Sequence, residues 1–304
     1  MKTVIFGCGK IANRVAKGFE HVKGNELVGF ASKDINKAKE YALKYNVELY
    51  GNYDYFLNDP SIDAIYVCTY NLNHYELISD CIKHHKHVIC EKPMALSVKE
   101  NDELFALAKE NNVLLMEALK SVFLPITNKV KQMINDKVIG EVHHIEASFV
   151  RNGNHSLDHW INNPKCGVTK DLAEYCVGTI NYLLDKKPVI EYKYKNNTEE
   201  ISDNTGEFIL NYENIKAHVL VSNAFDGDSS LKVFGTKGII VIPDYWKTGK
   251  GYYLLDGNRY ELNEELISDF YYEIQHFSDC LNNKLLQSPI MSEEFSHNII
   301  DITQ

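Results

Sequence analysis

Short apolar runs alternate with segments of helical spacing over residues 1–118. The apolar runs, which predict buried β-strands, are 4–6, 26–31, 48–50, 64–69, 87–90 and 113–116. Predicted helices lie between them, for example at 35–45, and Ser97 and Glu100 form a capping box that opens another helix. This alternation is typical of a doubly wound parallel sheet that helices cover on both faces. Ligands bind to such sheets beyond the carboxyl ends of the strands.

From about residue 119 the pattern changes to shorter strands joined by Asn, Asp and Gly turns, which favours a mostly antiparallel sheet. The predicted strands are 141–151, 189–195, 207–210, 217–222, 231–234 and 239–242. The predicted helices are 125–135, 264–281 and 292–301. We therefore predict an α/β chain of two domains, a doubly wound parallel sheet over 1–118 and an α+β domain with an open sheet over 119–304.

The composition narrows the classes of partner. The 304 residues carry a net charge of -10 without any basic run, which argues against nucleic acid because neutralising phosphates requires clustered Lys and Arg. No apolar run approaches the roughly 20 residues of a membrane span. The chain enters a strand at once, so we also expect no signal peptide. The seven cysteines are scattered and form no C-x-x-C pair, which favours a reducing, cytoplasmic compartment.

The first predicted strand ends in a glycine-rich turn. Residues 7–12, Gly-Cys-Gly-Lys-Ile-Ala, spell G-x-G-x-x-A between a strand and a helix. Gly7 allows the tight turn, Gly9 lets the backbone approach a pyrophosphate, and a small last residue lets helix and strand pack closely. The phosphates would bind the free N–H groups at the start of the helix, whose apolar face we expect to begin at Ile11. The motif predicts a dinucleotide site that includes Lys10 and Ile11.

Ser32 and Lys33 follow the second predicted strand, where NAD-binding folds place an acid on the ribose 2′-hydroxyl. No acid stands at that strand end, and Asp34 comes slightly later beside a cation. A hydroxyl and an ammonium suit a 2′-phosphate, so the sequence favours NADP over NAD. The alternative is that Lys33 is a solvated surface charge.

Glu91-Lys92-Pro93 ends the fifth predicted strand, at the ligand edge of the sheet. A lysine held there can hydrogen-bond a reacting oxygen and offset its developing charge. The proline can adopt the cis form. The alternative is a surface lysine in a turn.

Asp171 and Tyr175 lie four residues apart after Gly167. On one helix this spacing would put both on the same face. A tyrosine there can exchange a proton with a substrate hydroxyl, and a nearby ammonium would favour its phenolate. The alternative is an aspartate at a helix start and a half-buried tyrosine.

His155, Asp158 and His159 have a faint likeness to metal ligands. Metal ligands occur as sets, and no matching set of Cys, His, Asp or Glu stands out elsewhere in the sequence. We therefore predict no metal site and interpret this stretch as a polar loop.

Together these motifs resemble the Gfo/Idh/MocA oxidoreductase family, named for glucose–fructose oxidoreductase and inositol dehydrogenase. Five motifs follow in the family's order, at 7–12, 69–74 (T-Y-N-L-N-H, with tyrosine for the usual proline), 91–93, 171–175 and 273–277. The run 116–119 with Phe123 and Pro125 is similar to the branch that contains dimeric dihydrodiol dehydrogenase. Ala173 and Glu174 depart from the family's D-x-G-x-[HY] segment, which leaves the pocket shape and the substrate open.

The resemblance implies an N-terminal Rossmann domain and a C-terminal α+β domain whose open sheet often forms the interface of a homo-oligomer, a dimer or tetramer. It also implies hydride transfer between nicotinamide C4 and a hydroxyl-bearing carbon of a sugar, cyclic polyol or dihydrodiol. Lys92 would orient the substrate oxygen, Tyr175 would exchange the proton, and Asp171 would bind substrate hydroxyls. The residues implied to line the cofactor are Thr69, Asn71, His74, Glu91 and Lys92.

Two other functions keep the same fold. One is a nucleotide-bound sensor without turnover, which the retention of both Lys92 and Tyr175 argues against. The other is an enzyme such as a glycosidase that uses a tightly held nicotinamide transiently, and no feature of the sequence demands it.

Overall fold

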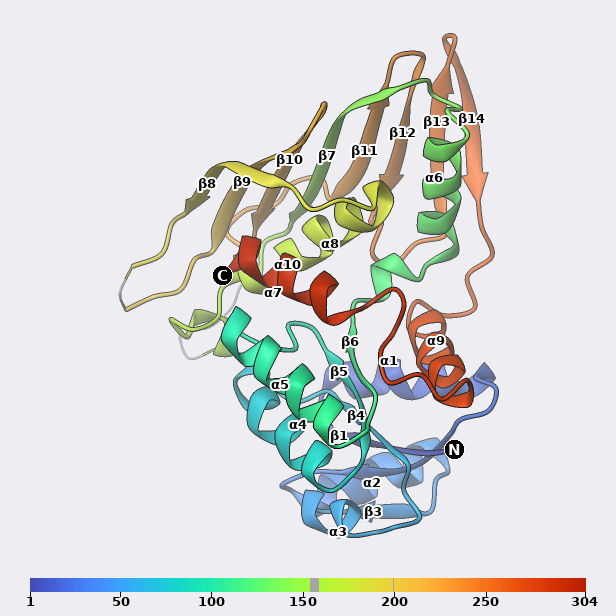
Figure 1. Cartoon of the computed structure of the whole chain (residues 1–304), viewed down its shortest axis with the longest axis vertical. Helices are drawn as coiled ribbons and strands as arrows, with labels where there is room; N and C mark the ends of the chain where they lie inside the picture. The colour runs from blue at the N-terminus through green and yellow to red at the C-terminus, as the bar shows by residue number, and fades with distance from the viewer. Residues whose placement is uncertain (154–158, 199) are drawn as a thin grey trace. The chain divides into compact units, whose positions relative to one another are not determined.

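The chain falls into two compact units in the computed structural model (Figure 1), which describes residues 1–153, 159–198 and 200–304. The first unit comprises Met1–Ala118 and Phe270–His297, and the second comprises Leu119–Asp269 and Asn298–Gln304. The chain therefore passes between the units at three places. Helix α10 (Glu293–Thr303) contains the last of them.

A six-stranded parallel sheet forms the centre of the first unit, in the order β3-β2-β1-β4-β5-β6. Its strands are β1 (Lys2–Phe6), β2 (Glu26–Ala31), β3 (Leu49–Gly51), β4 (Ala64–Val67), β5 (His87–Glu91) and β6 (Leu115–Ala118). The chain winds from β1 toward β3 and then from β4 toward β6. Right-handed crossovers therefore place the two sets of helices on opposite faces of the sheet. The prediction of a doubly wound parallel sheet is confirmed.

The helices of the first unit are α1 (Lys10–Gly18), α2 (Ile35–Tyr45), α3 (Tyr53–Leu57), α4 (His74–Lys83), α5 (Val98–Glu110) and α9 (Tyr271–Asn282). α9 comes late in the sequence and packs on α1. Gly18 makes this close packing feasible, because a Cβ there would lie 2.8 Å from Ile274 Cδ1. The sequence analysis assigned α9 to the second domain, whereas its apolar side packs within the first unit.

One mixed sheet forms the centre of the second unit, in the order β14-β13-β12-β11-β7-β10-β9-β8. Its strands are β7 (Val142–Val150), β8 (Val189–Lys195), β9 (Thr205–Tyr212), β10 (Ile215–Ser222), β11 (Ser230–Gly235), β12 (Gly238–Pro243), β13 (Lys250–Leu255) and β14 (Asn258–Asn263). β7 and β10 pair in parallel, and the other neighbours pair antiparallel. The prediction of a mostly antiparallel sheet is confirmed.

Helices cover one face of this sheet (Figure 1). The helices of the second unit are α6 (Pro125–Asn135), α7 (Val168–Asp171) and α8 (Ala173–Leu184), and α8 packs on both β7 and β10. Alternate strand residues such as Ala147 and Val219 are buried beneath them, as the period of two in a strand requires. Residues between them on the opposite face, such as Glu146, Ser148 and His218, are half-buried, and Tyr192 of β8 is 46% exposed.

Two features of the second half differ from the sequence analysis. β13 and β14 were not predicted, although the Asp256-Gly257 pair between them is a typical hairpin turn. Nearly every residue of β14 is exposed, so no apolar pattern marks it. The helix predicted at 264–281 begins only at Tyr271, and the Glu264 N–H instead extends the sheet by donating to the Gly249 carbonyl at 2.7 Å.

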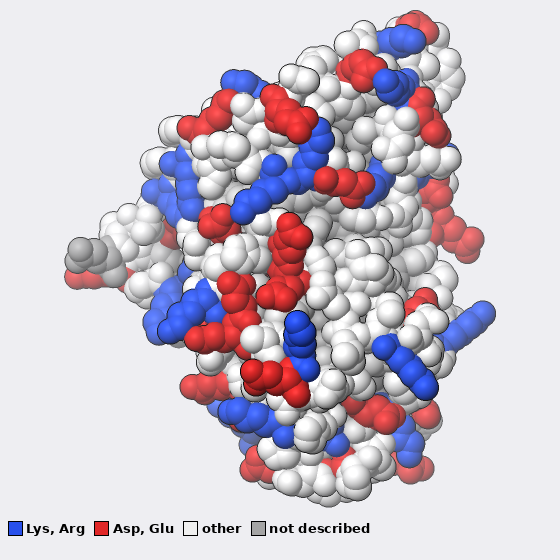
Figure 2. All heavy atoms as spheres, viewed as in Figure 1, with Lys and Arg blue, Asp and Glu red and all other residues white. Residues whose placement is uncertain are grey.

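Charged side chains of both signs are interspersed over the face shown in Figure 2. All seven cysteines are free thiols, and Cys8 alone of them is half-exposed. Among the described residues, no helix combines the length and the apolar character needed to cross a membrane.

His87, at the start of β5, makes the stability of the first unit depend on pH. Its Nδ1 accepts the Leu114 N–H at 2.9 Å, which requires an unprotonated nitrogen, and burial lowers the pKa of this imidazole. Unfolded chains bind the proton with a pKa of about 6.5. The stabilisation is thus complete above that value and is lost as the pH falls through the lowered pKa.

We therefore expect His87→Asn, which keeps an acceptor near the Nδ1 position but does not titrate there, to lose less stability than the parent chain between about pH 7.5 and 5.5. Thermal unfolding at several pH values measures the difference. The exposed His21, changed to Asn, is the matched control. Parallel pH profiles for the parent and the His87 variant would contradict the assignment.

Candidate functional site

The carboxyl ends of β1, β2 and β4 lie side by side in the first unit. The Gly7 N–H donates to Ala31 O at 2.9 Å, and the Cys68 N–H donates to Phe6 O at the same distance. These bonds bring Gly7 close to the residues that follow β2 and β4. The polar residues predicted at these strand ends therefore share one edge of the sheet.

The turn after β1 has the geometry of a phosphate-binding loop. Gly7 has a φ of +106°, and a Cβ there would lie 2.7 Å from Cys68 O, so only glycine fits. A Cβ at Gly9 would meet nothing within 4 Å, which leaves its outer side open. The Tyr41 hydroxyl donates to Gly9 O at 2.9 Å and fixes the turn from α2.

α1 begins at this turn with an N-terminus suited to an anion. Gly9 is the N-cap residue, no side chain caps the first N–H groups, and the first turn has no acidic residue. Lys10 and Ile11 are both exposed there. The buried side of α1 begins at Ala12, so the expectation that it begins at Ile11 is wrong. An outward Ile11 agrees with the prediction that it lies near a cofactor.

The residues after β2 present a hydroxyl and two ammonium groups. Ser32 is buried, and its Oγ accepts the Asp34 N–H at 3.2 Å, which leaves its own hydroxyl hydrogen to donate. The Asp34 carboxylate caps α2 by accepting a backbone N–H. Lys33 is exposed. Lys37, which the sequence analysis did not single out, lowers the pKa of Cys8 by its charge, although burial of Cys8 dominates and raises that pKa to about 12.

The turn after β5 carries Lys92, which is half-buried and precedes a cis peptide bond to Pro93. His74 holds this turn from the loop after β4. Its Nδ1 lies 2.9 Å from Pro93 O and its Nε2 lies 3.1 Å from Thr69 O. His74 is buried, and this burial, with the Lys92 charge as a smaller cause, lowers its pKa. The neutral ring has one N–H, so it donates to one of the two carbonyls at a time.

The other predicted residues of this edge are less exposed than their loop position suggests. Thr69 is half-buried and Asn71 is buried in the loop between β4 and α4. Glu91 is also buried, and it accepts the Tyr66 hydroxyl at 2.9 Å. The same hydroxyl lies 3.0 Å from Glu273 Oε1 on α9. Direct contact of these residues with a cofactor stays a prediction.

In the second unit, Asp171 and Tyr175 do not share one helix. α7 ends at Asp171, and α8 begins after the single intervening residue Leu172. Asp203 holds the start of α7, since its carboxylate accepts the Thr169 N–H at 2.7 Å. The Tyr175 N–H donates to Leu172 O at 3.2 Å. The helical spacing argument therefore does not apply, and the roles of both residues stay predictions.

Tyr175 lies in an aromatic cluster. Its ring centroid is 5.8 Å from that of Phe149 and 6.5 Å from that of Trp246, and the latter two rings stack at 3.7 Å. All three side chains are buried. Arg151 lies over the Phe149 ring and Lys247 over the Trp246 ring, where cations are attracted to the ring faces. The sequence analysis did not single out Phe149 or Trp246 as neighbours of Tyr175, because an apolar position in a strand or loop is equally typical of a core.

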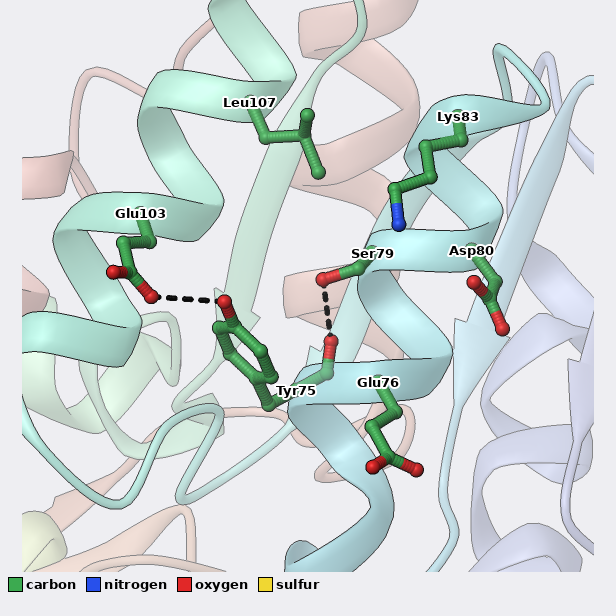
Figure 3. A pocket seen from close by; sticks show the side chains of 7 residues that line it. All are labelled: Tyr75, Glu76, Ser79, Asp80, Lys83, Glu103 and Leu107. Carbon is green, nitrogen blue, oxygen red and sulfur yellow. Dashed lines mark hydrogen bonds between the residues drawn. The ribbon is translucent and has the colours of Figure 1, made fainter.

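Two other features of the chain have no link to the predicted site. An open groove between α4 and α5 is crossed by the hydrogen bond from the Tyr75 hydroxyl to Glu103, at 2.8 Å (Figure 3), and contains no predicted site residue. Within 1–153, 159–198 and 200–304, no three His, Cys, Asp or Glu side chains form a cluster that could hold a metal ion. His155 and Asp158 lie outside the described residues.

Two family models match the sequence. Residues 1–119 match a model described as an oxidoreductase family with an NAD-binding Rossmann fold. Residues 127–241 match the model of the Gfo/Idh/MocA C-terminal domain. Together the two models cover most of the chain.

Curated relatives align with nearly the full length of the chain. The trans-1,2-dihydrobenzene-1,2-diol dehydrogenase of Xenopus tropicalis is 29% identical over 316 residues, which covers 98% of this chain and 94% of the relative. The protein of the same name from Homo sapiens is 24% identical over 291 residues, which covers 92% and 87%.

Solved structures share the fold of both units. An aldose-aldose oxidoreductase from Caulobacter crescentus, complexed with glycerol, has a TM-score of 0.90 and 20% identity over 99% of this chain and 95% of that one. A 3-ketoreductase from Actinomadura kijaniata, in complex with NADP and TDP-benzene, has a TM-score of 0.88 and 20% identity over 99% and 94%. At this identity the likeness shows the fold alone.

Proposed function

Because the chain belongs to the Gfo/Idh/MocA family of oxidoreductases, we propose that it transfers a hydride between NADP(H) and a hydroxyl-bearing carbon of a small cyclic diol or sugar. The family and the dehydrogenases among its relatives favour an NAD(P)-dependent enzyme over a sensor without turnover. The observation that carries the choice of substrate is the stack of Phe149 and Trp246 beside the Tyr175 phenol.

The residues of the first unit fit a dinucleotide. The open side of Gly9 and the uncapped start of α1 would take a pyrophosphate. The Ser32 hydroxyl and the ammonium groups of Lys33 and Lys37 support a 2′-phosphate, and a structure of the same fold is in complex with NADP. The bound nicotinamide would supply or accept the hydride.

The chain's own residues would handle the substrate oxygen and its proton. Lys92 would bind the oxygen and offset the negative charge that develops on it, because an ammonium in a partly desolvated site acts strongly on such charge. Tyr175 would give up or take the hydroxyl proton, and Asp171 would accept a hydrogen bond from a neighbouring hydroxyl. These three roles follow the family resemblance.

The aromatic stack supports a ring-shaped substrate. These buried rings give the Tyr175 phenol apolar surroundings, which would exclude water from the reacting carbon and suit the apolar face of a carbocycle or pyranose. Both a dihydrodiol and a sugar have such a face. The names of the curated relatives support the dihydrodiol as the first compound to test.

Ser32→Asp tests the cofactor. We expect it to weaken NADPH binding and to strengthen NADH binding, because a carboxylate repels a 2′-phosphate and accepts a hydrogen bond from a 2′-hydroxyl. Gly9→Ala is the matched control: it should fold, since its Cβ meets no atom within 4 Å, but weaken both cofactors equally. Quenching of protein fluorescence measures the four affinities. An unchanged NADPH to NADH ratio in Ser32→Asp would contradict the NADP assignment.

Lys92→Met and Tyr175→Phe test the reaction. Turnover is followed by NADPH absorbance with trans-1,2-dihydrobenzene-1,2-diol, aldoses and cyclic polyols. We expect each variant to lower kcat by about 10²-fold or more, with NADPH affinity little changed. If both residues act on one proton transfer, the kcat of the double variant should be little lower than the kcat of the slower single variant. Near-normal turnover in either would remove that residue from the mechanism.

The open face of the second unit's sheet supports a homo-oligomer. Val189, Tyr192 and Tyr194 are exposed on one face of β8, and His218 of β10 pairs with Glu207 of β9 at 2.7 Å. A face of this mixed character is typical of contacts between copies of one chain. Light scattering of the purified protein should give the mass of a dimer or tetramer, and a monomer at micromolar concentration would contradict the proposal.

A further inference from the structure

We propose that Glu117 is a positioning residue for Lys92 and acts by holding the backbone N–H that follows the Lys92-Pro93 turn. The proposal rests on the proposed function, since it assigns Glu117 to the reaction through Lys92. The sequence analysis quoted Glu117 only within a run similar to one branch of the family and gave it no role.

Glu117 lies directly beside the strand that carries the turn. β6 pairs with β5 in parallel, and in this register Glu117 is the partner of Cys90, two residues before Lys92. The Glu117 side chain is 1% exposed. Its Oε1 accepts the Met94 N–H at 2.9 Å, and its Oε2 accepts the Ser296 hydroxyl at 2.7 Å. One carboxylate thus ties the far side of the turn to the first part of α10.

Packing alone gives no reason for a carboxylate at this position. The other residues of β6 are Leu115, Met116 and Ala118, which are all apolar and buried. Burial penalises the charged form and raises the pKa of Glu117, while the Met94 N–H, the Ser296 hydroxyl and the Lys92 charge act in the opposite direction. Burying the Glu117 carboxyl group costs folding free energy, and its hydrogen bond to the turn gives a reason for its presence.

The turn is held on both sides of Lys92. On the near side, Glu91 is fixed by the Tyr66 hydroxyl. On the far side, His74 contacts Pro93 O and Glu117 binds the Met94 N–H. The Lys92 charge contributes, as a smaller cause, to lowering the pKa of His74 and opposes the rise in the pKa of Glu117. Fixing the backbone on both sides restricts the positions that the ammonium can reach, which is how a positioning residue contributes to a reaction rate.

Two substitutions separate the hydrogen bond from the charge. Glu117→Gln removes the charge, but its amide oxygen can accept the Met94 N–H and its amide nitrogen can donate to Ser296 Oγ. Glu117→Asp keeps the charge, but it is shorter by one methylene group and cannot span both partners. Glu103→Gln is the matched control, because it removes one partly exposed carboxylate elsewhere in the first unit.

We expect Glu117→Gln to retain kcat within about threefold and Glu117→Asp to lose about tenfold or more, with KM and NADPH affinity little changed in both. Thermal unfolding checks that each variant is folded. A loss in Glu117→Gln but not in Glu117→Asp would assign the effect to the charge and overturn the proposal. Equal losses in both variants would also overturn it, because keeping the hydrogen bonds would then make no difference. A loss confined to thermal stability or NADPH affinity would also overturn it, because a purely structural role would then suffice.

A second measurement needs no substrate and separates this inference from the proposed function. The rate at which an N-hydroxysuccinimide ester acetylates Lys92 is measured by mass spectrometry, with the exposed Lys99 as internal reference. We expect this ratio to rise severalfold in Glu117→Asp and to stay unchanged in Glu117→Gln. An unchanged ratio in Glu117→Asp overturns the inference, whatever the activity. The parent chain could turn over no cyclic alcohol while the ratio still rises in Glu117→Asp. That result would support the anchoring of Lys92 and contradict only the proposed function.

Discussion

The first unit depends on the close approach of two strand ends, between which only glycine fits. A Cβ at Gly7 would overlap the Cys68 carbonyl, and the φ of +106° is one that residues with a side chain rarely adopt. This approach lets β1 and β4 pair as neighbours although the chain winds in opposite directions from them. The sheet's switch point, and with it the shared edge of Gly7, Ser32 and Thr69, follows from this one contact.

Beyond the switch point, the first unit buries polar groups that its core does not need. Tyr66, Glu91 and Glu273 form one hydrogen-bonded group. Glu117 accepts the backbone N–H of Met94, shortly after Glu91 in the chain. Buried carboxyl groups cost free energy unless they are well paired. These groups lie near the carboxyl ends of β4, β5 and β6, where Lys92 follows β5, as expected if the chain gives up some stability to hold this turn in place.

The elements of the fold could be predicted where local pattern decides them. The buried strands of the first unit are marked by short apolar runs, and the turn at Gly7 is marked by its glycines. β14 does not, because its exposed residues carry no apolar period and its pairing depends on β13. The break at Leu172 could not be foreseen either, since the carboxylate that caps α7 comes from Asp203, far along the chain.

The candidate site was predictable only as far as its motifs. Lys92 and Tyr175 stand in recognisable motifs. Phe149 and Trp246 cannot be told from core residues in the sequence, because their rings stack only in the folded structure. The contact that Glu117 makes with the turn was equally hard to predict from the sequence. A single acid in an apolar strand has no local signal for its partner, because Met94 becomes its neighbour through strand pairing and the turn.

The two units supply different chemistry, and each relies on a glycine for it. Gly7 forms the tight turn that leads into α1, whose first N–H groups have no side-chain cap and suit an anionic cofactor. Gly167, with a φ of +108°, opens α7 at a point where a side chain would collide with Asp203. Asp203 caps α7 by accepting the Thr169 N–H. α8 follows α7 after Leu172 and carries Tyr175, whose ring lies beside Phe149. The first unit therefore fits a group common to many reactions, whereas we propose that the aromatic surroundings of Tyr175 in the second unit influence the choice of substrate. A change of substrate within this architecture should accordingly alter Phe149 or Trp246 before it alters the turn at Gly7.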